Sequence, residues 1–463
     1  MIVLPLALAQ FVASYAATTM TVAVSAVAAD LGTTVLGVQT AITVFTLTMA
    51  SLMVPGSKLS DVLGRKRCFL AGLAVYGTGA LLASLARGPG MLILGYSLLE
   101  GIGSALMIPP IYILVTVTSR DLTARARALG VVSGAGALGA AAGPLLGGLV
   151  TAWLGWRASF LLQVLLVGLI VLLALRVAEP PAPPRGKGFD VGGAILSAAG
   201  LFFVVFGVLQ SGEYGWLVSR ADFAVGGVVL IPAGSISPVW LFAVLGAALL
   251  AVFFAHLRAR ERAGREPLVP PGLFRDRITG LGLATQHVQW LVLQGAFFVV
   301  AVFLQEVRGF NAIETGLLLT PATVGILAAS AAAGRMARRH SQRRLIRGGF
   351  VLAVAGLVLV LLLVRVDSSL VPGLFLLGAG VGIMLTASAN LVQSRFPDSA
   401  QGDISGVSRS VSNLGSSVGT ALAGSVLAGT PHLGDRSFAL ALTTLVVAAA
   451  AGLVAALLLP APE

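Results

Sequence analysis

The sequence predicts an all-α polytopic membrane protein with 14 transmembrane helices. Of its 463 residues, 57% are hydrophobic and only 10% are charged, and the mean hydropathy is +0.97. Soluble domains carry about 25% charged residues. The apolar residues form stretches long enough to cross a hydrocarbon core of about 30 Å, which takes about 20 helical residues. The basic residues gather in every second loop between these stretches.

The expected spans follow one another along the whole chain. They cover residues 3–29, 36–57, 69–86, 91–117, 129–152, 157–177, 191–211, 239–257, 278–305, 315–333, 348–364, 370–393, 405–428 and 437–459. Met1 leads into the first span without a basic region, so we expect no signal peptide.

The Lys and Arg residues are divided unequally between the two sets of loops. Alternate assignment of the loops places 24 of the 30 on one side and only six on the other, namely Arg87, Arg157, Arg220, Arg308, Arg365 and Arg436. An excess of basic residues marks the cytoplasmic side of a membrane protein. We therefore expect a multi-pass protein of the cell membrane with both termini in the cytoplasm. The net charge of +12 reflects this topology and predicts no nucleic-acid partner.

The stretch GAGALGAAAGPLLGG (134–148) opens with G-x-G-x-x-G spacing at Gly134, Gly136 and Gly139. This spacing indicates a dinucleotide site only after a strand and at the start of a soluble helix. Here it lies among the 29 uncharged residues between Arg127 and Arg157. In such a membrane helix the backbone amides are bonded internally, so we expect no cofactor.

Other sequence features exclude further classes of chemistry. The chain has no G-x4-G-K-[ST] loop, so ATP is not the expected energy source. Cys68 is the only cysteine and the four histidines are scattered, which leaves no metal-ligand spacing. We expect no metal site, and we expect that the protein is not an enzyme.

Repeated motifs divide the chain into halves. The pattern Gly130-x8-Gly139-x3-Gly143 returns 276 residues later, and the loop SKLSDVLGRKR (57–67) has a basic counterpart, GRMARRHSQRR (334–344). We expect six-helix bundles over 1–177 and 278–463. Between them, 178–277 supplies linkers, an inserted helix pair (191–211 and 239–257) and an outer loop (212–238). For 223–239, a small hairpin and an ordered loop are both open.

These motifs resemble the major facilitator superfamily and, within it, the 14-spanner drug/proton antiporter family. The match on the fifth span comprises Gly130, Gly139, Gly143, Pro144, Gly147 and Gly148. The loop at 57–67 is similar to the cytoplasmic loop between helices two and three, with Asp61, Gly64, Arg65 and Arg67 in place. The resemblance implies a major facilitator fold, with two six-helix bundles and two inserted helices. It also implies that Asp61 latches the halves together, and Arg409 is a candidate partner.

The glycines of the fifth span have a direct physical use. Gly139, Gly143 and Gly147 remove side chains from one helix face, which allows a neighbouring helix to approach closely. Pro144 removes a backbone hydrogen bond and favours a kink. Plain structural packing is the alternative interpretation of the same spacing.

Glu100 is the one acidic residue deep inside an expected span, about 13 Å along the helix from Met91. A charged carboxylate at that depth costs at least about 2.5 kcal/mol, so we expect it to be protonated or paired. A group with this property suits proton coupling; a permanently protonated carboxyl that bonds a neighbouring helix is the alternative. His287 lies at a similar depth in the ninth span, either as a partner of Glu100 or as a structural residue.

Polar side chains at helical spacing predict a substrate cavity that is amphipathic and nearly uncharged. Polar groups inside a bilayer face protein or water-filled space, although some simply bond adjacent helices. The candidates are Gln10, Ser14, Tyr15, Thr18 and Thr21 in the first span, Gln286, Gln289, Trp290 and Gln294 in the ninth, and Asn390 in the twelfth.

The predicted function is secondary active efflux of amphipathic small molecules, of the multidrug type, by proton antiport with alternating access. The expected partners are a small-molecule substrate, protons and the lipid bilayer, and we expect a monomer. The resembled family carries an acid in its first helix and an arginine in its fourth, where this chain has Ala16 and Ser97. This difference favours, as an alternative, a same-fold exporter or flippase of lipids, fatty acids or a metabolite. An intramembrane enzyme and a non-transporting sensor find less support in the sequence.

Overall fold

Helices make up most of the chain, as the apolar stretches predict. The computed structural model describes residues 3–118, 122–176, 188–225, 228–337, 339–363, 370–396, 401–429 and 433–460. Within these residues, 12 helices are long and apolar enough to cross a membrane, or 13 if the bent pair Gly130–Ala140 and Ala142–Leu154 counts as one. The all-α membrane fold class is confirmed, whereas the count of 14 stays a prediction.

The elements occur in the following order. They are α1 (Val3–Val22), α2 (Val24–Asp30), α3 (Val35–Leu63), α4 (Arg65–Ser84), α5 (Pro89–Leu92), η1 (Ile93–Glu100), α6 (Gly101–Thr118), α7 (Leu122–Leu154), α8 (Trp156–Leu175), α9 (Val191–Tyr214), β1 (Phe223–Val225), β2 (Val228–Ile231), α10 (Pro238–Arg262), η2 (Pro271–Phe274), α11 (Arg277–Val302), η3 (Phe303–Val307), α12 (Ala312–Met336), α13 (Gln342–Leu362), α14 (Leu370–Gln393), α15 (Gln401–Ala428) and α16 (Asp435–Leu457). Of these, η1 and η3 are π-helices and η2 is a 3₁₀-helix.

The helix α15 is less apolar than the 12 candidate membrane helices. It is nevertheless long enough to cross a membrane, because its 28 residues span about 42 Å at 1.5 Å per residue. It is rich in Ser and Gly. Its Ser410 and Ser417 hydroxyls donate to the carbonyls of Ala50 and Thr43 in α3. These polar groups therefore face protein rather than lipid, and a low hydropathy is compatible with a membrane position.

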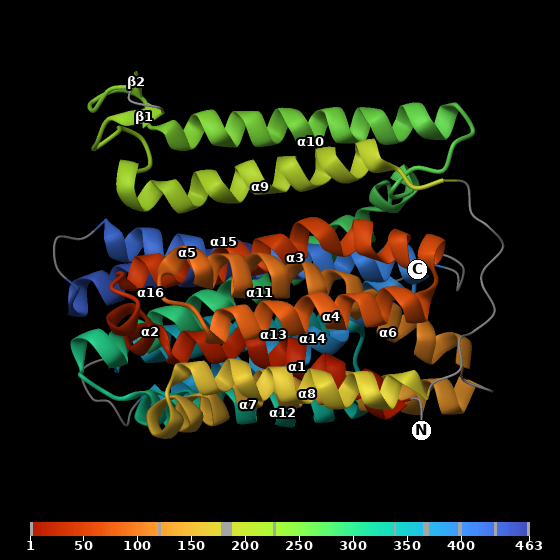
Figure 1. Cartoon of the computed structure of the whole chain (residues 1–463), viewed down its shortest axis with the longest axis horizontal. Coiled ribbons are helices and arrows are strands. Elements are labelled where there is room, and N and C mark those ends of the chain that lie inside the picture. The colour runs from red at the N-terminus through yellow and green to blue at the C-terminus, as the bar shows by residue number, and fades with distance from the viewer. Residues whose placement is uncertain are drawn as a thin grey trace.

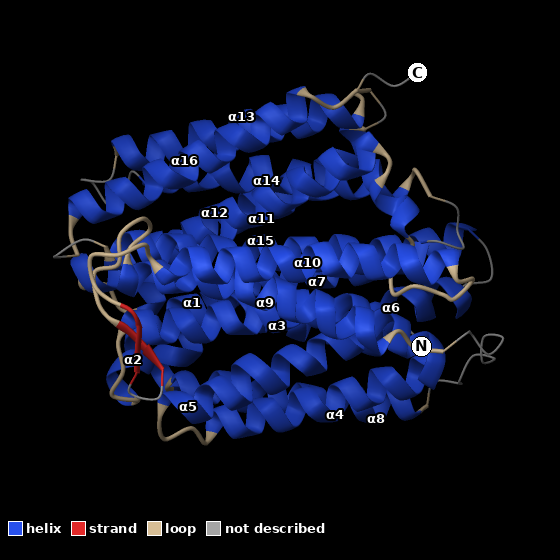
Figure 2. Ribbon diagram, turned by 90° about the horizontal axis from the view of Figure 1, so that it is seen from above, coloured by secondary structure: helices blue, strands red, loops and turns tan. Residues whose placement is uncertain are grey.

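The long helices lie side by side along one axis, and α9 and α10 form a separate layer above α3 and α15 (Figure 1). Within this layer α9 packs against α10 on one side and against both α3 and α15 on the other. At one end the layer carries the antiparallel hairpin β1–β2, on the side of the bundle away from the marked chain termini (Figures 1 and 2). The hairpin confirms one of the two alternatives for 223–239.

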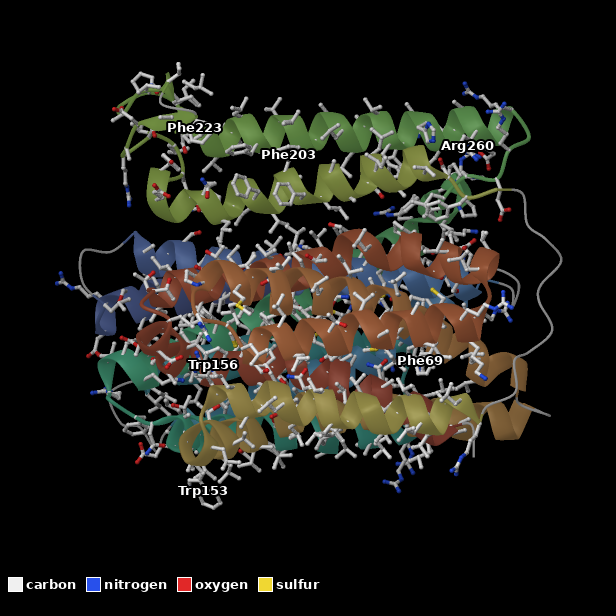
Figure 3. All side chains as sticks on the ribbon, in the orientation of Figure 1. Phe69, Trp153, Trp156, Phe203, Phe223 and Arg260 are labelled. Carbon is white, nitrogen blue, oxygen red and sulfur yellow. The ribbon has the colours of Figure 1, made fainter. Side chains whose placement is uncertain are left out.

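The two ends of the bundle differ in charge. We call the end that carries Lys58, Arg260 and Asp403 the basic end, and the end that carries Asp30, Arg157 and Glu306 the opposite end. Arg260 lies at the same end as the marked chain termini (Figures 1 and 3). The division into domains at 177 and 278 stays a prediction.

The repeated glycines make equivalent contacts in the two repeats. A methyl group on Gly139 of α7 would overlap the carbonyl of Phe11 in α1, and one on Gly415 of α15 would overlap the carbonyl of His287 in α11. Both pairs are related by the 276-residue offset of the sequence repeat. The glycines therefore serve the same close helix crossing twice.

The expectation of one continuous helix over 3–29 is wrong, because the chain breaks at Ala23 between α1 and α2. A side chain from η3 stabilises the break. The amide of Gln305 donates to the Val22 carbonyl at 3.2 Å and accepts from the Ser25 N–H at 3.2 Å. Two backbone groups freed by the break are thus satisfied by a residue about 280 positions away.

Candidate functional site

A buried acid lies inside the first group of helices. Glu100 ends the π-helix η1 and has 0% of its surface exposed. Neither carboxyl oxygen has a hydrogen-bond partner among the described residues. The backbone of Gly79 in α4 crosses close to it, since a Cβ there would lie 2.7 Å from the Glu100 nitrogen. π-Helical turns are frequent at functional sites, and an unpaired buried carboxyl is stable there only in its neutral form.

Tyr76 and Tyr96 interact with this acid, and Tyr15 and Gln163 interact with Tyr76. Tyr76 of α4 interacts electrostatically with Glu100, Tyr96 and Tyr15, and its hydroxyl donates to Oε1 of Gln163 in α8. All three tyrosines are at most 1% exposed, and the hydroxyls of Tyr15 and Tyr96 have no hydrogen-bond partner among the described residues. We call Tyr15, Tyr76, Tyr96, Glu100 and Gln163 the Glu100 cluster.

A second polar cluster joins α15 to α6 and α1. The guanidinium of Arg409 in α15 lies 4.8 Å above the Tyr112 ring of α6 and donates to its hydroxyl. Tyr112 donates to Gln10 Oε1 at 3.3 Å, and the Gln10 amide donates to Ser14 Oγ at 3.2 Å. Gln10 and Ser14 are predicted cavity residues, whereas Tyr112 was not singled out by the sequence. We call these four residues the Arg409 cluster.

The other predicted cavity residues mostly bond neighbouring helices. Thr18 donates to the Ala140 carbonyl in α7, and the Gln294 amide donates to the Ala17 carbonyl. Gln286 accepts from Ser408 and Gln289 accepts from Ser388, while Thr21 bonds its own helix. Trp290 packs against the core and Asn390 is exposed. The substrate role of these residues stays a prediction.

His287 lies in α11 where that helix crosses α15, beside Gly415 and Val411 of α15. Glu100 contacts α4 and its own π-helix instead. No hydrogen bond or ion pair between His287 and Glu100 occurs in the part of the chain that the structure describes.

The glycine helix α7 packs on two neighbours. Methyl groups on Gly143 and Gly147 would overlap Thr18 and Thr19 of α1, and one on Gly148 would overlap the Ala312 carbonyl of α12. A methyl group on Gly316 of α12 would likewise overlap the carbonyl of Pro144. Gly130 differs, because no described atom lies within 4 Å of a Cβ added there. The motif therefore joins α1 to α7 within one repeat and α7 to α12 between repeats.

The loop at 57–67 makes the turn between α3 and α4. Gly64 adopts φ 99°, a backbone conformation that residues with a side chain rarely take, and Arg65 and Arg67 begin α4. The side chain of Asp61 lies outside the described part of the structure, so its pairing with Arg409 stays a prediction. The ion pairs nearby come from Lys58, which contacts Asp403 of α15 at 2.9 Å and Glu266 at 3.3 Å.

A third polar group fastens the inserted helix pair at the basic end. Asp190 precedes α9, where its carboxylate accepts from the backbone N–H of Gly193 and from that of Leu268 in the following linker. His256 and Arg260 of α10 contact the same carboxylate at 2.9 and 3.5 Å. Burial works to raise the pKa of Asp190, but the bonds from His256 and the two N–H groups outweigh it and lower the pKa.

Comparison with known proteins agrees with this architecture. The Major Facilitator Superfamily model matches residues 6–222 and 221–420. The chain is 33% identical over 427 residues to a probable actinorhodin transporter of Streptomyces coelicolor, which covers 89% of this chain and 69% of the relative. It is 30% identical over 456 residues to the cephamycin export protein CmcT of Amycolatopsis lactamdurans, covering 95% and 89%. It is 28% identical over 393 residues to the multidrug resistance protein Stp of Mycobacterium tuberculosis, covering 85% and 69%.

A solved structure has the same fold. The crystal structure of an auto-inhibited POT family peptide transporter superposes with a TM-score of 0.67 at 14% identity, covering 98% of this chain and 95% of that one. At this identity the likeness concerns the fold alone. Together with the family model and its relatives, it places this chain in the major facilitator superfamily, as a membrane transporter of small molecules.

Proposed function

We propose that the protein exports amphipathic small molecules by proton antiport with alternating access. The observation that carries the proposal is Glu100, a fully buried acid without a hydrogen-bond partner among the described residues. Relatives of the protein at 28% and 30% identity that are named for resistance or export support the direction of transport and the class of cargo.

The Arg409 cluster is the proposed substrate site. It joins α15 of one repeat to α6 and α1 of the other, so its partners separate when the repeats move apart. A guanidinium beside an aromatic ring offers charge, hydrogen bonds and an apolar face to a bulky ligand.

Glu100 is the proposed coupling acid. Each proton that enters down 100 mV supplies about 2.3 kcal/mol, which is enough to concentrate a substrate about fifty-fold. The free energy is usable only if protonation changes the packing of the helices around the acid. Glu100 suits this role because it ends η1, which packs against α3 and α4.

The basic end is the proposed cytoplasmic end, because it carries the excess of Lys and Arg residues. The opposite end, with Asp30, Arg157 and Glu306, then faces outward. In this orientation both termini are cytoplasmic, and the protein is proposed to reside in the cell membrane.

The proposal is tested in vesicles that contain the purified protein and a pH gradient. Antiport predicts that vesicles with an acidic lumen accumulate actinorhodin or cephamycin, and that a protonophore abolishes the accumulation. Equal uptake with and without the gradient would exclude proton antiport. Movement of labelled phospholipid in place of both antibiotics would favour the alternative, a lipid transporter of the same fold.

A further inference from the structure

A small cavity lies beside the Glu100 cluster, between α1, η1 and α8. Its polar lining consists of Thr19, Tyr96, Ser159 and Gln163, and its volume is about that of one water molecule. A site of this size holds a water when two to four polar groups converge on it. The cavity meets that condition.

Two of the lining hydroxyls need a partner. Ser159 is 2% exposed and Tyr96 is 1% exposed, and neither hydroxyl has a hydrogen-bond partner among the described residues. A buried hydroxyl without a partner is costly. A water between them would satisfy both groups and still have bonding capacity for Gln163.

The cavity connects to Glu100 on its inner side. Gln163 lines the cavity and accepts the hydrogen bond of the Tyr76 hydroxyl. Tyr76 in turn interacts with Glu100. Tyr96 lines the cavity directly and interacts with Glu100, which lies four residues further along η1. A hydroxyl can accept one proton while it donates its own, and the Tyr96 hydroxyl has no partner among the described residues, so Tyr96 is the link between the cavity and the acid.

The cavity connects to the opposite end on its outer side. Trp156 forms part of its wall, and the indole N–H donates to Asp30 at 3.2 Å. Asp30 also pairs with Arg157, and both side chains are more than a third exposed. Figure 3 shows the contrast between Trp156, inside the bundle, and Trp153, which points out of it. One indole N–H therefore links the cavity wall to an exposed ion pair at the opposite end.

We propose that the cavity is a hydration site through which protons travel between the opposite end and Glu100, apart from the substrate site. This inference rests on the proposed role of Glu100 in antiport. A water that carries an extra proton gives it to the Tyr96 oxygen, and Tyr96 passes its own proton to the Glu100 carboxylate. A neutral water, a neutral tyrosine and a neutral carboxylic acid remain.

The route is separate from the Arg409 cluster but shares one helix with it. Ala16 and Thr19 of α1 face the cavity, whereas Gln10 and Ser14 of the same helix bond toward Tyr112 and Arg409. Protonation therefore acts on the part of α1 that holds Ala16 and Thr19, and substrate binding acts on the part that holds Gln10 and Ser14. Substrate does not need to enter the proton route, nor protons the substrate site.

The test compares Gln163→Leu and Ser159→Ala with wild type in proteoliposomes that contain a pH-sensitive dye. Both variants are expected to slow substrate-evoked proton flux at least tenfold, while substrate binding and gradient-free substrate exchange change less than twofold. Ser84→Ala is the matched control, because Ser84 is a buried serine whose hydroxyl bonds its own helix. Normal proton flux in both variants would overturn the proposed route.

Glu100→Gln distinguishes this inference from the proposed function. If Glu100→Gln abolishes proton coupling while Gln163→Leu and Ser159→Ala retain it, the function stands and the route is wrong. If Glu100→Gln retains coupling, the role of Glu100 and the route fall together.

An infrared measurement remains informative if a variant transports poorly. The carboxyl stretch lost in Glu100→Gln is followed in wild type and Gln163→Leu after transfer into D₂O. Deuterium should shift this band within seconds in wild type and much more slowly in Gln163→Leu. The same exchange rate in both proteins would contradict the proposed route.

Discussion

Lys58 and Asp403 form an ion pair of 2.9 Å that joins α3 to α15 at the basic end. It is the last of several contacts along this helix pair. The Gln39 amide donates to the Thr420 carbonyl, Ser417 donates to Thr43, and Ser410 donates to Ala50. All three of these hydrogen bonds end on backbone carbonyls, whereas the ion pair depends on two side chains. The pair is therefore the contact most easily removed by substitution.

Asp403→Asn is expected to open the basic end. A partly buried ion pair contributes about 1 kcal/mol, which corresponds to about a fivefold change in the ratio of closed to open molecules. Spin labels at Val62→Cys and Ser394→Cys, in a Cys68→Ala background, report the separation of α3 and α14. The long-distance population should increase. Glu266→Gln is the control with a smaller expected change, because the Glu266 side chain is 47% exposed; equal shifts would argue against the Asp403 pair as the main latch.

Gly139→Ala is expected to destabilise the protein and reduce transport, because the added methyl group overlaps the Phe11 carbonyl. Overpacking of this kind costs about 1–3 kcal/mol. Gly134→Ala on the same helix is the matched control, since no described atom lies within 4 Å of a Cβ at that position. Thermal unfolding in detergent measures the difference. Equal Tm values for the two variants would contradict the close crossing of α1 and α7.

Arg409→Ala is expected to weaken substrate binding at least about tenfold, since a hydrogen bond from a charged group to the ligand contributes about 1.5–3 kcal/mol. Tyr112→Phe keeps the ring under the guanidinium and loses the hydroxyl that links Arg409 to Gln10. Its effect should be smaller. Binding measured at equilibrium separates affinity from transport rate, and unchanged affinity in Arg409→Ala would place the substrate elsewhere.

Asp190→Asn is expected to lower the Tm at neutral pH. The pKa of Asp190 is lowered from the ordinary value of 3.8, so the carboxylate stabilises the folded protein above that pH, and the stabilisation is lost as the pH falls through the lower folded-state pKa. The difference in Tm between wild type and variant should therefore be full at pH 7 and shrink below about pH 4. A difference that is the same at all pH values would show that the carboxylate charge does not contribute.

Sequence patterns predicted the fold class and the packing role of one helix face. The apolar stretches indicated the membrane helices, and the glycine spacing in α7 indicated a close crossing, which the structure places on Phe11, Thr18 and Thr19. Both features are local, because they depend on the length of a stretch and on the absence of side chains from one face of it.

Long-range partners could not be predicted in the same way. These helices are apolar on all sides, so periodicity does not indicate which face of a helix meets which neighbour. Glu100 was recognised as a buried acid, but its neighbour Tyr76 and the Gln163 that Tyr76 bonds lie on two other helices. The break at Ala23 depends on Gln305, and the link from Arg409 to Gln10 depends on Tyr112. Tyr76, Gln163, Gln305 and Tyr112 belong to no motif that the sequence offers.

Substrate-evoked proton flux in proteoliposomes tests the central claim most directly. Wild type and Glu213→Gln, a substitution of an exposed acid at the end of α9, should both move protons when a transported substrate is added. Glu100→Gln should bind the same substrate and move no protons. Proton flux in Glu100→Gln equal to that of wild type would contradict the account.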